Sequence, residues 1–469
     1  MPRILAVLTA LLLLVAACSS SDDDVAGESP PDAADADDPA EDPAEPAADD
    51  ATAADDADAD DATAADADDD AGGTSVDDEA PSDAVSPSEG PADESLEPVR
   101  IGMMNQENDP VGSFPEAREA AEGAVDYINA ELGGIDGHPV ELVVCAQASP
   151  EEAQACAQEL SADDLVSVVN MVNIWTLTFD FYGTMGDTPV IGGLPLFDTD
   201  YNAANARYFN GGSISVYAAM ARFTVEELGV TKVAVLENSN PAANAATELG
   251  LLPIYEDMGV EVVRIVVPQP ATDVAPQVSE AADVGADAVL VLTSAFECPL
   301  IATAAAQFGI PAETMIYSAT CTDDTVLDQV GDEMVGAFVA RGGYTEDDPW
   351  APEEVQNRIA QTFDLLDTYA PDVPLGGLGP LGFVTMLDIE LLYDEIGFDN
   401  LDGDTILATM DDGSQRGVLG SFGWACVYAD IDLTSVCSGD NLFVQLLPDF
   451  TTEPPLSDGF VNGLQLLGG

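Results

Sequence analysis

Seven cysteines are the residues of this sequence whose type and spacing most directly suggest chemistry. Apart from Cys18, they all lie after residue 140, at positions 145, 156, 298, 321, 426 and 437. An even number of cysteines in an oxidising compartment predicts disulfides. We expect sequential pairing, Cys145–Cys156, Cys298–Cys321 and Cys426–Cys437, because each pair then lies within one local supersecondary unit. A metal site is the rival interpretation, but no two of these cysteines have CxxC spacing, and we predict no metal.

The amino-terminal segment indicates what Cys18 does. Arg3 precedes an apolar run from Ile4 to Val15. The run is shorter than the about 20 residues of a membrane-spanning helix and has the length of a signal-peptide core. It ends in Val-Ala-Ala-Cys, the lipobox pattern. We therefore expect residues 1–17 to be a lipoprotein signal peptide, and Cys18 to carry lipid that anchors the chain to the extracytoplasmic face of the cell membrane. An ordinary secretory signal is the alternative.

Few residues have the spacing that catalysis requires. His138 is the only histidine, and no Gly-x-Ser-x-Gly elbow lies near it, so a Ser-His-Asp triad is not predicted. The stretch 377–382 matches G-x-G-x-x-G but follows a Pro-rich loop instead of a strand, and we interpret it as the entry to a helix over 383–396. The acids between 402 and 412 lack the spacing of a calcium loop. We expect no enzyme activity and no cofactor.

The charge of the chain excludes one class of partner. It contains 89 Asp plus Glu against 10 Lys plus Arg, a formal net charge of −79. No basic patch can therefore neutralise phosphates, and nucleic acid is excluded. Residues 19–97 contain 30 of the acids and no Lys or Arg, with too little apolar surface to fold. We expect residues 18–97 to be an acidic disordered tether, either a spacer or a solubilising tail.

The elements that would position a binding site begin at residue 98, where strands and helices alternate. A first series of apolar runs predicts strands at 99–103, 140–144, 166–172 and 190–191. A second series predicts strands at 232–236, 260–267, 288–293 and 315–317. The stretches between them predict helices at 115–132, 151–160, 243–258, 274–284 and 299–308. Strands that are apolar throughout indicate parallel sheets covered on both faces, and the length favours two α/β lobes.

Polar and aromatic side chains gather just after the predicted strands. Ligands of open parallel sheets bind beyond the carboxyl ends of the strands. The candidate ligand-binding residues at these positions are Asn105, Gln106, Asn173, Trp175, Thr176, Leu196, Phe197, Asn238, Asn240, Phe296 and Thr320. Neutral amides and aromatic rings suit a small organic solute. Turn formation is the alternative for the asparagines, and core packing is the alternative for the aromatic residues. Glu107 could pair with a cationic ligand, but we interpret it as a solvated acid.

Residues 124–142, AVDYINAELGGIDGHPVEL, resemble the first helix and second strand of the leucine/isoleucine/valine-binding proteins. These are type I periplasmic binding proteins that serve ABC importers. The segment GSFGW at 420–424 is similar to the C-terminal strand of that family. The resemblance extends over 99–447. It implies an α/β fold of two Rossmann-like lobes with parallel sheets, joined by a three-strand hinge and closing on a ligand between them.

The resemblance also implies lobe boundaries, with crossovers near residues 212, 341 and 419. Lobe 1 would comprise 98–212 and 342–419, and lobe 2 would comprise 213–341 and 420–469. Each expected disulfide then lies inside one lobe, so that none locks the hinge. Cys298 and Cys321 would follow neighbouring strands and face the cleft. Cys426 and Cys437 would close a terminal hairpin.

In this family, hydroxyls and backbone amides hold a ligand carboxylate, and an acid of lobe 2 pairs with the ligand ammonium. The resemblance places the carboxylate site at residues 174–176 and 195–197, where only Thr176 has a hydroxyl. It places the ammonium-binding acid at about Thr320, which carries no charge. The α-amino-acid signature is therefore incomplete in this chain.

The aromatic side chains imply a different pocket. Trp175, Phe197 and Phe296 would form an apolar, stacking surface, and Phe114 completes the predicted ligand-binding set. An amide, an aromatic compound or another weakly charged solute fits such a pocket at least as well as leucine.

The expected function is the extracytoplasmic solute-binding component of an ABC importer. The chain would act as a monomer that captures a small organic solute, such as an amino acid, an amide or an aromatic compound, and delivers it to an ABC permease. A sensory or receptor lipoprotein with the same fold is one alternative. A carboxylate-dependent hydrolase is another, although the alternation of strands and helices argues against it.

Overall fold

The computed structural model describes residues 90–109, 112–322, 324–345, 348–374, 378–415, 423–431, 433–453 and 460–467. The predicted signal peptide, Cys18 and the tether as far as residue 89 lie outside the described residues. Among the helices of the described ranges, none is both long enough and apolar enough to cross a bilayer.

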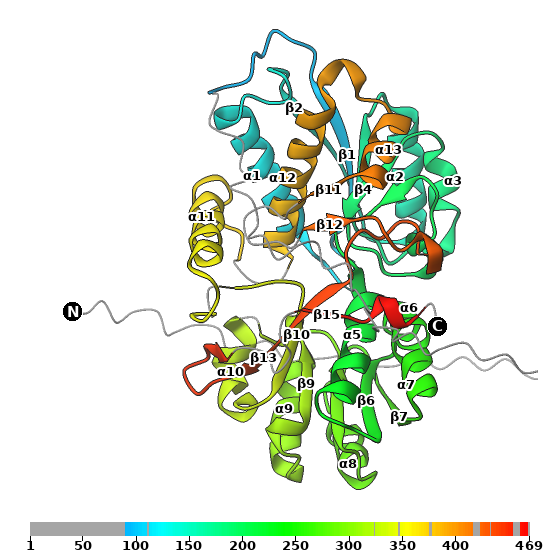
Figure 1. Ribbon diagram of the computed structural model, residues 1–469, viewed down its shortest axis with the longest axis vertical. Helices are drawn as coiled ribbons and strands as arrows, with labels where there is room; N and C mark the ends of the chain where they lie inside the picture. The colour runs from blue at the N-terminus through cyan, green and yellow to red at the C-terminus, as the bar shows by residue number, and fades with distance from the viewer. Residues whose placement is uncertain are drawn as a thin grey trace, which may run out of the picture. The chain divides into compact units, whose positions relative to one another are not determined.

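The first sheet contains five parallel strands in the order β2-β1-β3-β4-β5. They are β1 (Val99–Gln106), β2 (Val140–Gln147), β3 (Ser167–Val172), β4 (Val190–Gly193) and β5 (Ala206–Arg207). In Figure 1, α1 (Pro115–Glu131) and α12 (Gly379–Ile396) lie on one face of this sheet, and α2 (Pro150–Ala162) and α3 (Phe181–Met185) on the other. We call the sheet and these helices lobe 1. The remaining helices of lobe 1 are α4 (Asp198–Tyr201), α11 (Glu353–Tyr369) and α13 (Gly403–Asp412).

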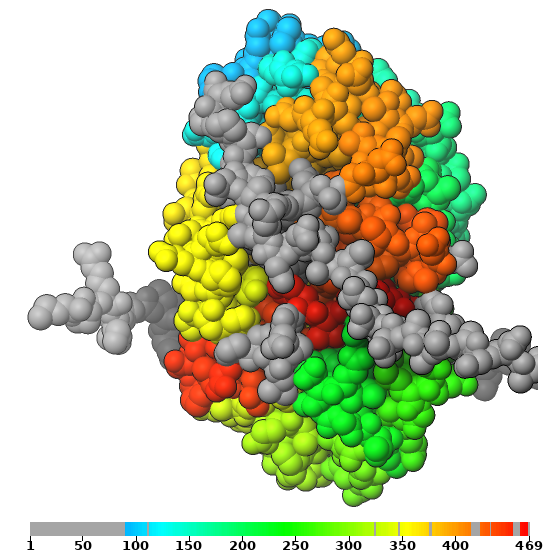
Figure 2. Space-filling model, in the orientation of Figure 1, coloured from blue at the N-terminus to red at the C-terminus, as the bar shows by residue number. Residues whose placement is uncertain are grey.

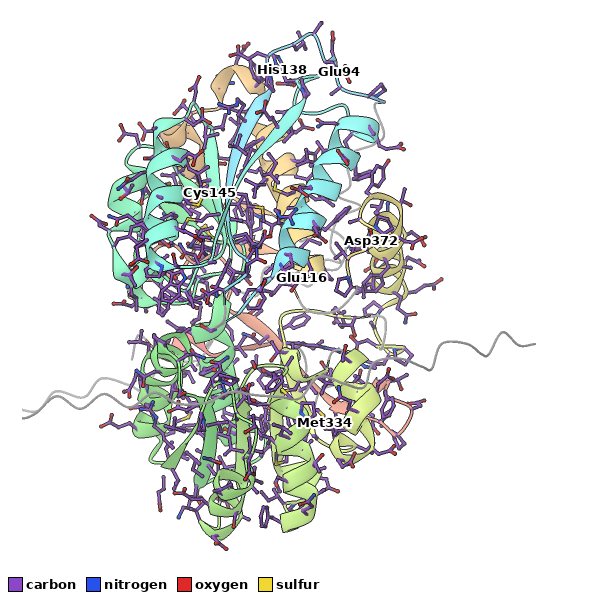
Figure 3. All side chains as sticks on the ribbon, turned by 180° about the vertical axis from the view of Figure 1, so that it is seen from behind. Glu94, Glu116, His138, Cys145, Met334 and Asp372 are labelled. Atoms are coloured by element: carbon purple, nitrogen blue, oxygen red, sulfur yellow. A yellow bond between two sulfur atoms is a disulfide. The ribbon has the colours of Figure 1, made fainter. Side chains whose placement is uncertain are left out.

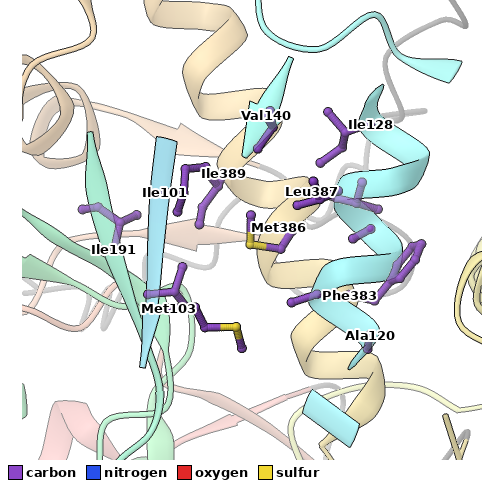
Figure 4. Close-up of a cluster of buried hydrophobic side chains, with 14 of the residues drawn as sticks. Ile101, Met103, Ala120, Ile128, Val140, Ile191, Phe383, Met386, Leu387 and Ile389 are labelled. Atoms are coloured by element: carbon purple, nitrogen blue, oxygen red, sulfur yellow. The ribbon is translucent and has the colours of Figure 1, made fainter. Parts of the chain in front are cut away.

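The helices of lobe 1 pack on alternate residues of the strands. Met103 belongs to the core beneath α1 and α12, whereas Met104 belongs to the core beneath α2. Successive side chains of a strand point to opposite faces, so an apolar run of consecutive residues supplies both cores. Figure 4 shows Met103 and Ile191 from the sheet facing Met386 and Phe383 of α12. Figure 2 shows α11 (yellow) and α12 (orange) at the surface of the molecule.

The second sheet has the order β14-β13-β10-β9-β8-β6-β7, with β15 also paired to β13. Its parallel strands are β6 (Lys232–Asn238), β7 (Glu261–Val267), β8 (Ala288–Leu292), β9 (Met315–Ser318) and β10 (Phe338–Arg341). Its antiparallel strands are β13 (Asp440–Leu446), β14 (Thr452–Glu453) and β15 (Val461–Asn462). The helices that pack on it are α5 (Gly212–Glu226), α6 (Pro241–Ala246), α7 (Leu252–Met258), α8 (Ala275–Asp283), α9 (Cys298–Phe308) and α10 (Asp324–Met334). We call this unit lobe 2.

Short elements complete the described chain. The 3-10 helices are η1 (Thr176–Thr178), η3 (Ala312–Thr314), η4 (Ala319–Thr322), η5 (Phe398–Asn400), η6 (Ala429–Ile431) and η7 (Leu464–Leu466). A separate two-stranded sheet pairs β11 (Ser414–Gln415) with β12 (Trp424–Ala425).

The single helix predicted over 243–258 is interrupted. A π-helical turn, η2 (Thr247–Leu251), separates α6 from α7. Pro253 lies in the first turn of α7, where its missing N–H breaks the regular α-helical hydrogen-bond ladder. The predicted single helix is therefore two α-helices joined by a π-helical turn, and both α-helices pack on the second sheet.

The described residues begin at Gly90, before the predicted end of the tether at residue 97. Gly90 forms a β-bridge with Leu132, and the Ala92 N–H donates to the Asn129 carbonyl at 2.8 Å. These backbone hydrogen bonds attach the chain to the end of α1 and the turn that follows it. Figure 3 shows Glu94 beside His138 at that end of lobe 1, away from Glu116 near the start of α1. Residues 90–97 are therefore part of lobe 1, contrary to the prediction from composition.

The third predicted passage between the lobes, near residue 419, lies outside the described residues. Trp424 and Cys437 pack in the core beneath α1 and α12, and the Trp424 ring lies 5.6 Å from the Phe209 ring. The chain enters the second sheet only at β13. The described residues between 423 and 437 are divided between the two cores, because Tyr428 and Val436 are buried in the core of lobe 2. The assignment of this segment to lobe 2 therefore stays a prediction.

Three disulfides are present, and they join the pairs expected from the sequence: Cys145–Cys156, Cys298–Cys321 and Cys426–Cys437. Two further expectations about them are wrong. Cys298 and Cys321 have no exposed surface and lie in the core of lobe 2, so they do not face a cleft. Cys426 and Cys437 do not close a hairpin, because β12 pairs with β11 and β13 pairs with β10.

Candidate ligand-binding site

The candidate site consists of the turns that follow the central strands at their carboxyl ends. In lobe 1 these are the turns after β1, β3 and β4, and in lobe 2 they are the turns after β6, β8 and β9. Side chains from several strands meet at this edge of a parallel sheet. The predicted ligand-binding residues lie in these turns or at the start of the helix that follows.

The turn after β1 is held by two fully buried amides. Asn105 donates from Nδ2 to the Phe114 carbonyl at 2.8 Å and to Glu107 Oε1 at 3.1 Å. Gln106 donates from Nε2 to the Gly112 carbonyl at 2.9 Å. Neither amide has exposed surface, so both hold the loop against the end of the strand. Among the described residues, Asn105 Oδ1 is buried and has no hydrogen-bond partner.

The turn after β3 positions the Trp175 ring. Asn173 Oδ1 accepts the Trp175 backbone N–H at 3.0 Å, so this asparagine serves turn formation. The Trp175 indole Nε1 donates to Asp109 Oδ2 at 3.0 Å, and Asp109 itself is buried. The ring is half-buried against the core beneath α2 and α3. Trp175 is therefore anchored at both its backbone and its indole nitrogen.

The turn after β4 closes on a buried carboxylate. Asp200 Oδ2 accepts the backbone N–H groups of Leu196 at 2.8 Å and Phe197 at 2.9 Å, and Oδ1 accepts the Tyr182 hydroxyl at 2.7 Å. Asp200 is 1% exposed. Burial raises the pKa of this carboxyl to about 6, although hydrogen bonds from Leu196, Tyr182 and Phe197 act in the opposite direction. The Phe197 ring is fully buried, so it packs inside lobe 1 instead of forming the open stacking surface expected of it.

A chain of hydrogen bonds continues from Asp200 into lobe 1. The hydroxyls of Tyr182 and Tyr208 are 2.6 Å apart, and Asn170 Nδ2 donates to the Tyr208 hydroxyl at 3.1 Å. Burial raises the pKa of both tyrosines well above its usual value. The Tyr208 backbone N–H donates to the Ser435 carbonyl at 2.7 Å. The network therefore connects the turn after β4 with the last passage of the chain towards lobe 2.

The two asparagines after β6 have different roles. Asn238 is 4% exposed, its Oδ1 accepts the Ser294 N–H at 2.8 Å, and its buried Nδ2 has no hydrogen-bond partner among the described residues. Asn240 begins α6, with Oδ1 accepting the Ala243 N–H at 2.8 Å and Nδ2 donating to Gln269 Oε1 at 2.7 Å. Asn240 is thus a helix cap, the alternative given by turn formation, whereas Asn238 retains an unused donor.

The other two predicted residues of lobe 2 lie at the surface. Phe296 is 62% exposed, an unusual position for a large aromatic ring. The Thr320 hydroxyl lies 2.8 Å from the Ser318 hydroxyl and donates to the Thr293 carbonyl at 3.3 Å. Both residues are accessible at the carboxyl edge of β8 and β9.

Three acids at this edge were not identified from the sequence. Asp109 and Asp200 are described above, and Glu297 is fully buried at the start of α9, where it accepts the Ser294 hydroxyl. Asp200 lies at the third position of a short helix, where an acid can accept the N-cap backbone N–H. Phe197 at the N-cap lacks the hydroxyl that would complete a recognisable capping box. Nothing in the local sequence distinguishes Asp109 or Glu297 from the many surface acids.

The other acids at the edge are ion-paired. Arg118 Nε lies 2.8 Å from Glu107 Oε1, and Arg264 lies 2.7 Å from Glu237 Oε1. Glu107 is only 8% exposed, so the interpretation of it as a solvated acid is wrong: the α1 arginine covers it. Within the described ranges, no group of three or more His, Cys, Asp or Glu side chains has an arrangement that could hold a metal ion.

Comparisons with known proteins give the chain its relatives. A family model described as periplasmic binding protein matches residues 98–425. No curated protein matches the sequence. Similar solved structures include an ABC transporter substrate-binding protein from Sphaerobacter thermophilus (17% identity, TM-score 0.65, 78% of this chain and 98% of that one). A second is a fatty acid ABC transporter substrate-binding protein from Thermomonospora curvata (14% identity, TM-score 0.62, 79% of this chain and 93% of that one). A third is a possible leucine/isoleucine/valine-binding protein from Rhodopirellula baltica (14% identity, TM-score 0.62, 79% of this chain and 98% of that one). At these identities the likeness concerns the fold.

Proposed function

Because the chain belongs to the periplasmic binding protein family, we propose that it is the solute-binding component of an ABC importer. The observation that carries the proposal is the family match over 98–425, which includes most of both lobes. The family implies a location outside the cytoplasm. Anchoring through Cys18, a monomeric state and delivery to an ABC permease belong to the same proposal.

The solute would be a small organic molecule held between the carboxyl edges of the two sheets. Lobe 1 contributes the half-buried Trp175 ring and the free Asn105 Oδ1, and lobe 2 contributes Asn238 and the exposed Phe296. Closure of the lobes on the solute would shift an open–closed equilibrium. The exposure of Phe296 supports this arrangement, because an aromatic ring that is exposed to solvent in the open protein would be buried when the lobes close.

A thermal-shift screen of the purified protein tests the proposal. The solutes are amino acids, amides and aromatic acids, and a bound one should stabilise the protein by about 3 kcal/mol at about a hundred times its dissociation constant. Trp175→Ala should abolish the shift. Phe398→Ala is the matched control, since that ring stacks on His138 (centroids 3.4 Å apart) in the turn that precedes β2. An equal ligand shift in wild type and Trp175→Ala would place binding elsewhere.

Uptake measurements separate an importer from a receptor. Deleting the gene should abolish cellular uptake of the solute found in the screen. If uptake is unchanged while the purified protein binds that solute, the importer role is refuted and a receptor role is favoured.

A further inference from the structure

The backbone N–H groups at the carboxyl edge of lobe 1 are already used inside the protein. After β3, the Ile174 N–H donates to Gln106 Oε1 at 3.5 Å and the Trp175 N–H to Asn173 at 3.0 Å. After β4, the Leu194 N–H donates to a backbone carbonyl at 3.1 Å. Free N–H groups at such turns are what an anionic ligand requires. Five such donors of these turns, the N–H groups of residues 174, 175, 194, 196 and 197, already have partners inside the protein.

Asp200 takes the two remaining donors of the turn after β4. Its carboxylate accepts the N–H groups of Leu196 and Phe197, and the Tyr182 hydroxyl completes its coordination. Asp200 belongs to the same short segment as these donors. Unlike a free ligand, it therefore loses no translational or rotational freedom when it accepts their hydrogen bonds. A ligand carboxylate would have to displace this buried internal carboxylate or be placed beside it.

The cations at the carboxyl edges of both sheets are also neutralised. Arg118 pairs with Glu107 and Arg264 pairs with Glu237. At the end of β10, Arg341 pairs with the fully buried Asp348. Each of these guanidinium groups thus has a carboxylate of the chain as its ion-pair partner, although Arg341 Nε has no hydrogen-bond partner among the described residues. A second carboxylate gains little beside a charge that is already paired.

Several neutral polar atoms at these edges are buried without a partner among the described residues, including Gln147 Oε1 at the end of β2 and Thr176 Oγ1 after β3. Two others, on β1 and β6, belong to different lobes. Asn105 Oδ1 is a buried acceptor and Asn238 Nδ2 is a buried donor, and neither has a hydrogen-bond partner among the described residues. Their identities are determined by their neighbours. Asn105 Nδ2 donates to two acceptors, and Asn238 Oδ1 accepts an N–H, so neither amide can be flipped without losing those bonds. Buried polar groups of this kind require partners.

From this we propose that the solute is an uncharged carboxamide and not a carboxylate: its N–H is accepted by Asn105 Oδ1 and its carbonyl accepts from Asn238 Nδ2. The inference rests on the proposed function, because the two asparagines belong to different lobes and meet one solute only on closure. Trp175 and Phe296 would cover the apolar part of the solute.

Matched pairs of solutes test the proposal directly. Isobutyramide and isobutyrate, benzamide and benzoate, and leucinamide and leucine differ at the group in question and little elsewhere. Calorimetric titration of the purified protein should show binding of the amide at least about tenfold tighter than binding of the acid, because burying a carboxylate without a partner is more costly than burying a paired amide. Binding of the acids as tightly as the amides overturns the proposal and leaves solute capture standing.

A pair of variants tests the role of Asn238. Asn238→Asp keeps the acceptor for the Ser294 N–H and replaces only the unused Nδ2, so amide affinity should fall by about tenfold. Asn240→Asp is the control: it keeps the cap on α6 and changes an Nδ2 that already has a partner, so amide affinity should be unchanged. Circular dichroism confirms that both variants are folded.

The outcomes separate the inference from the function on which it rests. Equal amide affinity in Asn238→Asp and wild type overturns the assignment of the carbonyl to Asn238, although the protein still binds solute. Failure of every amide and every acid to bind the folded wild-type protein overturns the proposed solute and the proposed function together.

Discussion

The stability of the Asp200→Asn variant relative to wild type should increase as the pH rises. The carboxyl is buried, its pKa rises from 3.8 to about 6 in the folded state, and its unfolded value is the ordinary one. Between these two values the folded state holds a proton that the unfolded state has released. Stability therefore falls as pH increases through this window. An asparagine at the same position does not titrate, and the variant lacks this loss.

The magnitude follows from the shift. A difference between 3.8 and about 6 corresponds to about 3 kcal/mol over the whole window, of which about 2 kcal/mol falls between about pH 4.5 and 7.5. The variant also loses a hydrogen bond: the asparagine oxygen can replace Oδ2, which accepts both N–H groups, but the side-chain NH2 cannot accept the Tyr182 hydroxyl. That penalty, about 1–3 kcal/mol, is the same at every pH. Only the pH-dependent part of the difference reports on the Asp200 carboxyl.

Urea unfolding of wild type and Asp200→Asn over this pH range measures the difference. The other acids titrate in both proteins and cancel. Asp198→Asn is the control, since Asp198 is exposed on the same short helix and its replacement removes one acid while leaving the buried Asp200 carboxyl in place. A wild-type minus Asp200→Asn difference that does not change with pH would refute the reasoning, because Asp200 would then titrate alike in folded and unfolded chains.

Three other substitutions test the packing and the site. Replacing Cys145 and Cys156 together by Ser should lower the free energy of unfolding by about 3 kcal/mol in urea melts, and an unchanged midpoint would show that the bridge is dispensable. Gly382→Ala should destabilise lobe 1, because a methyl group there runs into the Ala117 carbonyl of α1; a melting temperature equal to wild type would contradict this close contact. Phe296→Ala should leave the melting temperature of the free protein within about 2 °C, since an exposed ring contributes less than about 0.5 kcal/mol, but should weaken solute binding in calorimetry, and the reverse pattern would assign the ring to structure.

The strands could be predicted because the physical cause of their burial is local. In β6, Val233 and Val235 belong to one core of lobe 2, while Ala234 and Leu236 belong to the other. Such a run has to be apolar throughout, which the sequence displays directly. The last residue of the G-x-G-x-x-G match, Gly382, allows α12 to approach α1 closely. Among the described residues, no strand lies between α11 and α12.

The site was less predictable because its groups depend on distant partners. Asn238 and Asn240 are two residues apart and equally polar, yet only the fold determines that Asn240 caps a helix and Asn238 keeps a free donor. Glu107 reads as one surface acid among 89 acids, and its burial depends on Arg118 from the next helix. The position of Trp424 depends on packing against Phe209, more than two hundred residues earlier.

The disulfides have a consequence for how the protein matures. Each of the six cysteines is joined to its nearest neighbour along the chain, with separations of 11, 23 and 11 residues. A polypeptide that is threaded through a membrane amino end first presents the two partners of a bridge one after the other. Oxidation in order of emergence then gives the native bridges without thiol–disulfide exchange. Cys18 would emerge before them all and compete for Cys145, and the predicted thioether would remove that competitor.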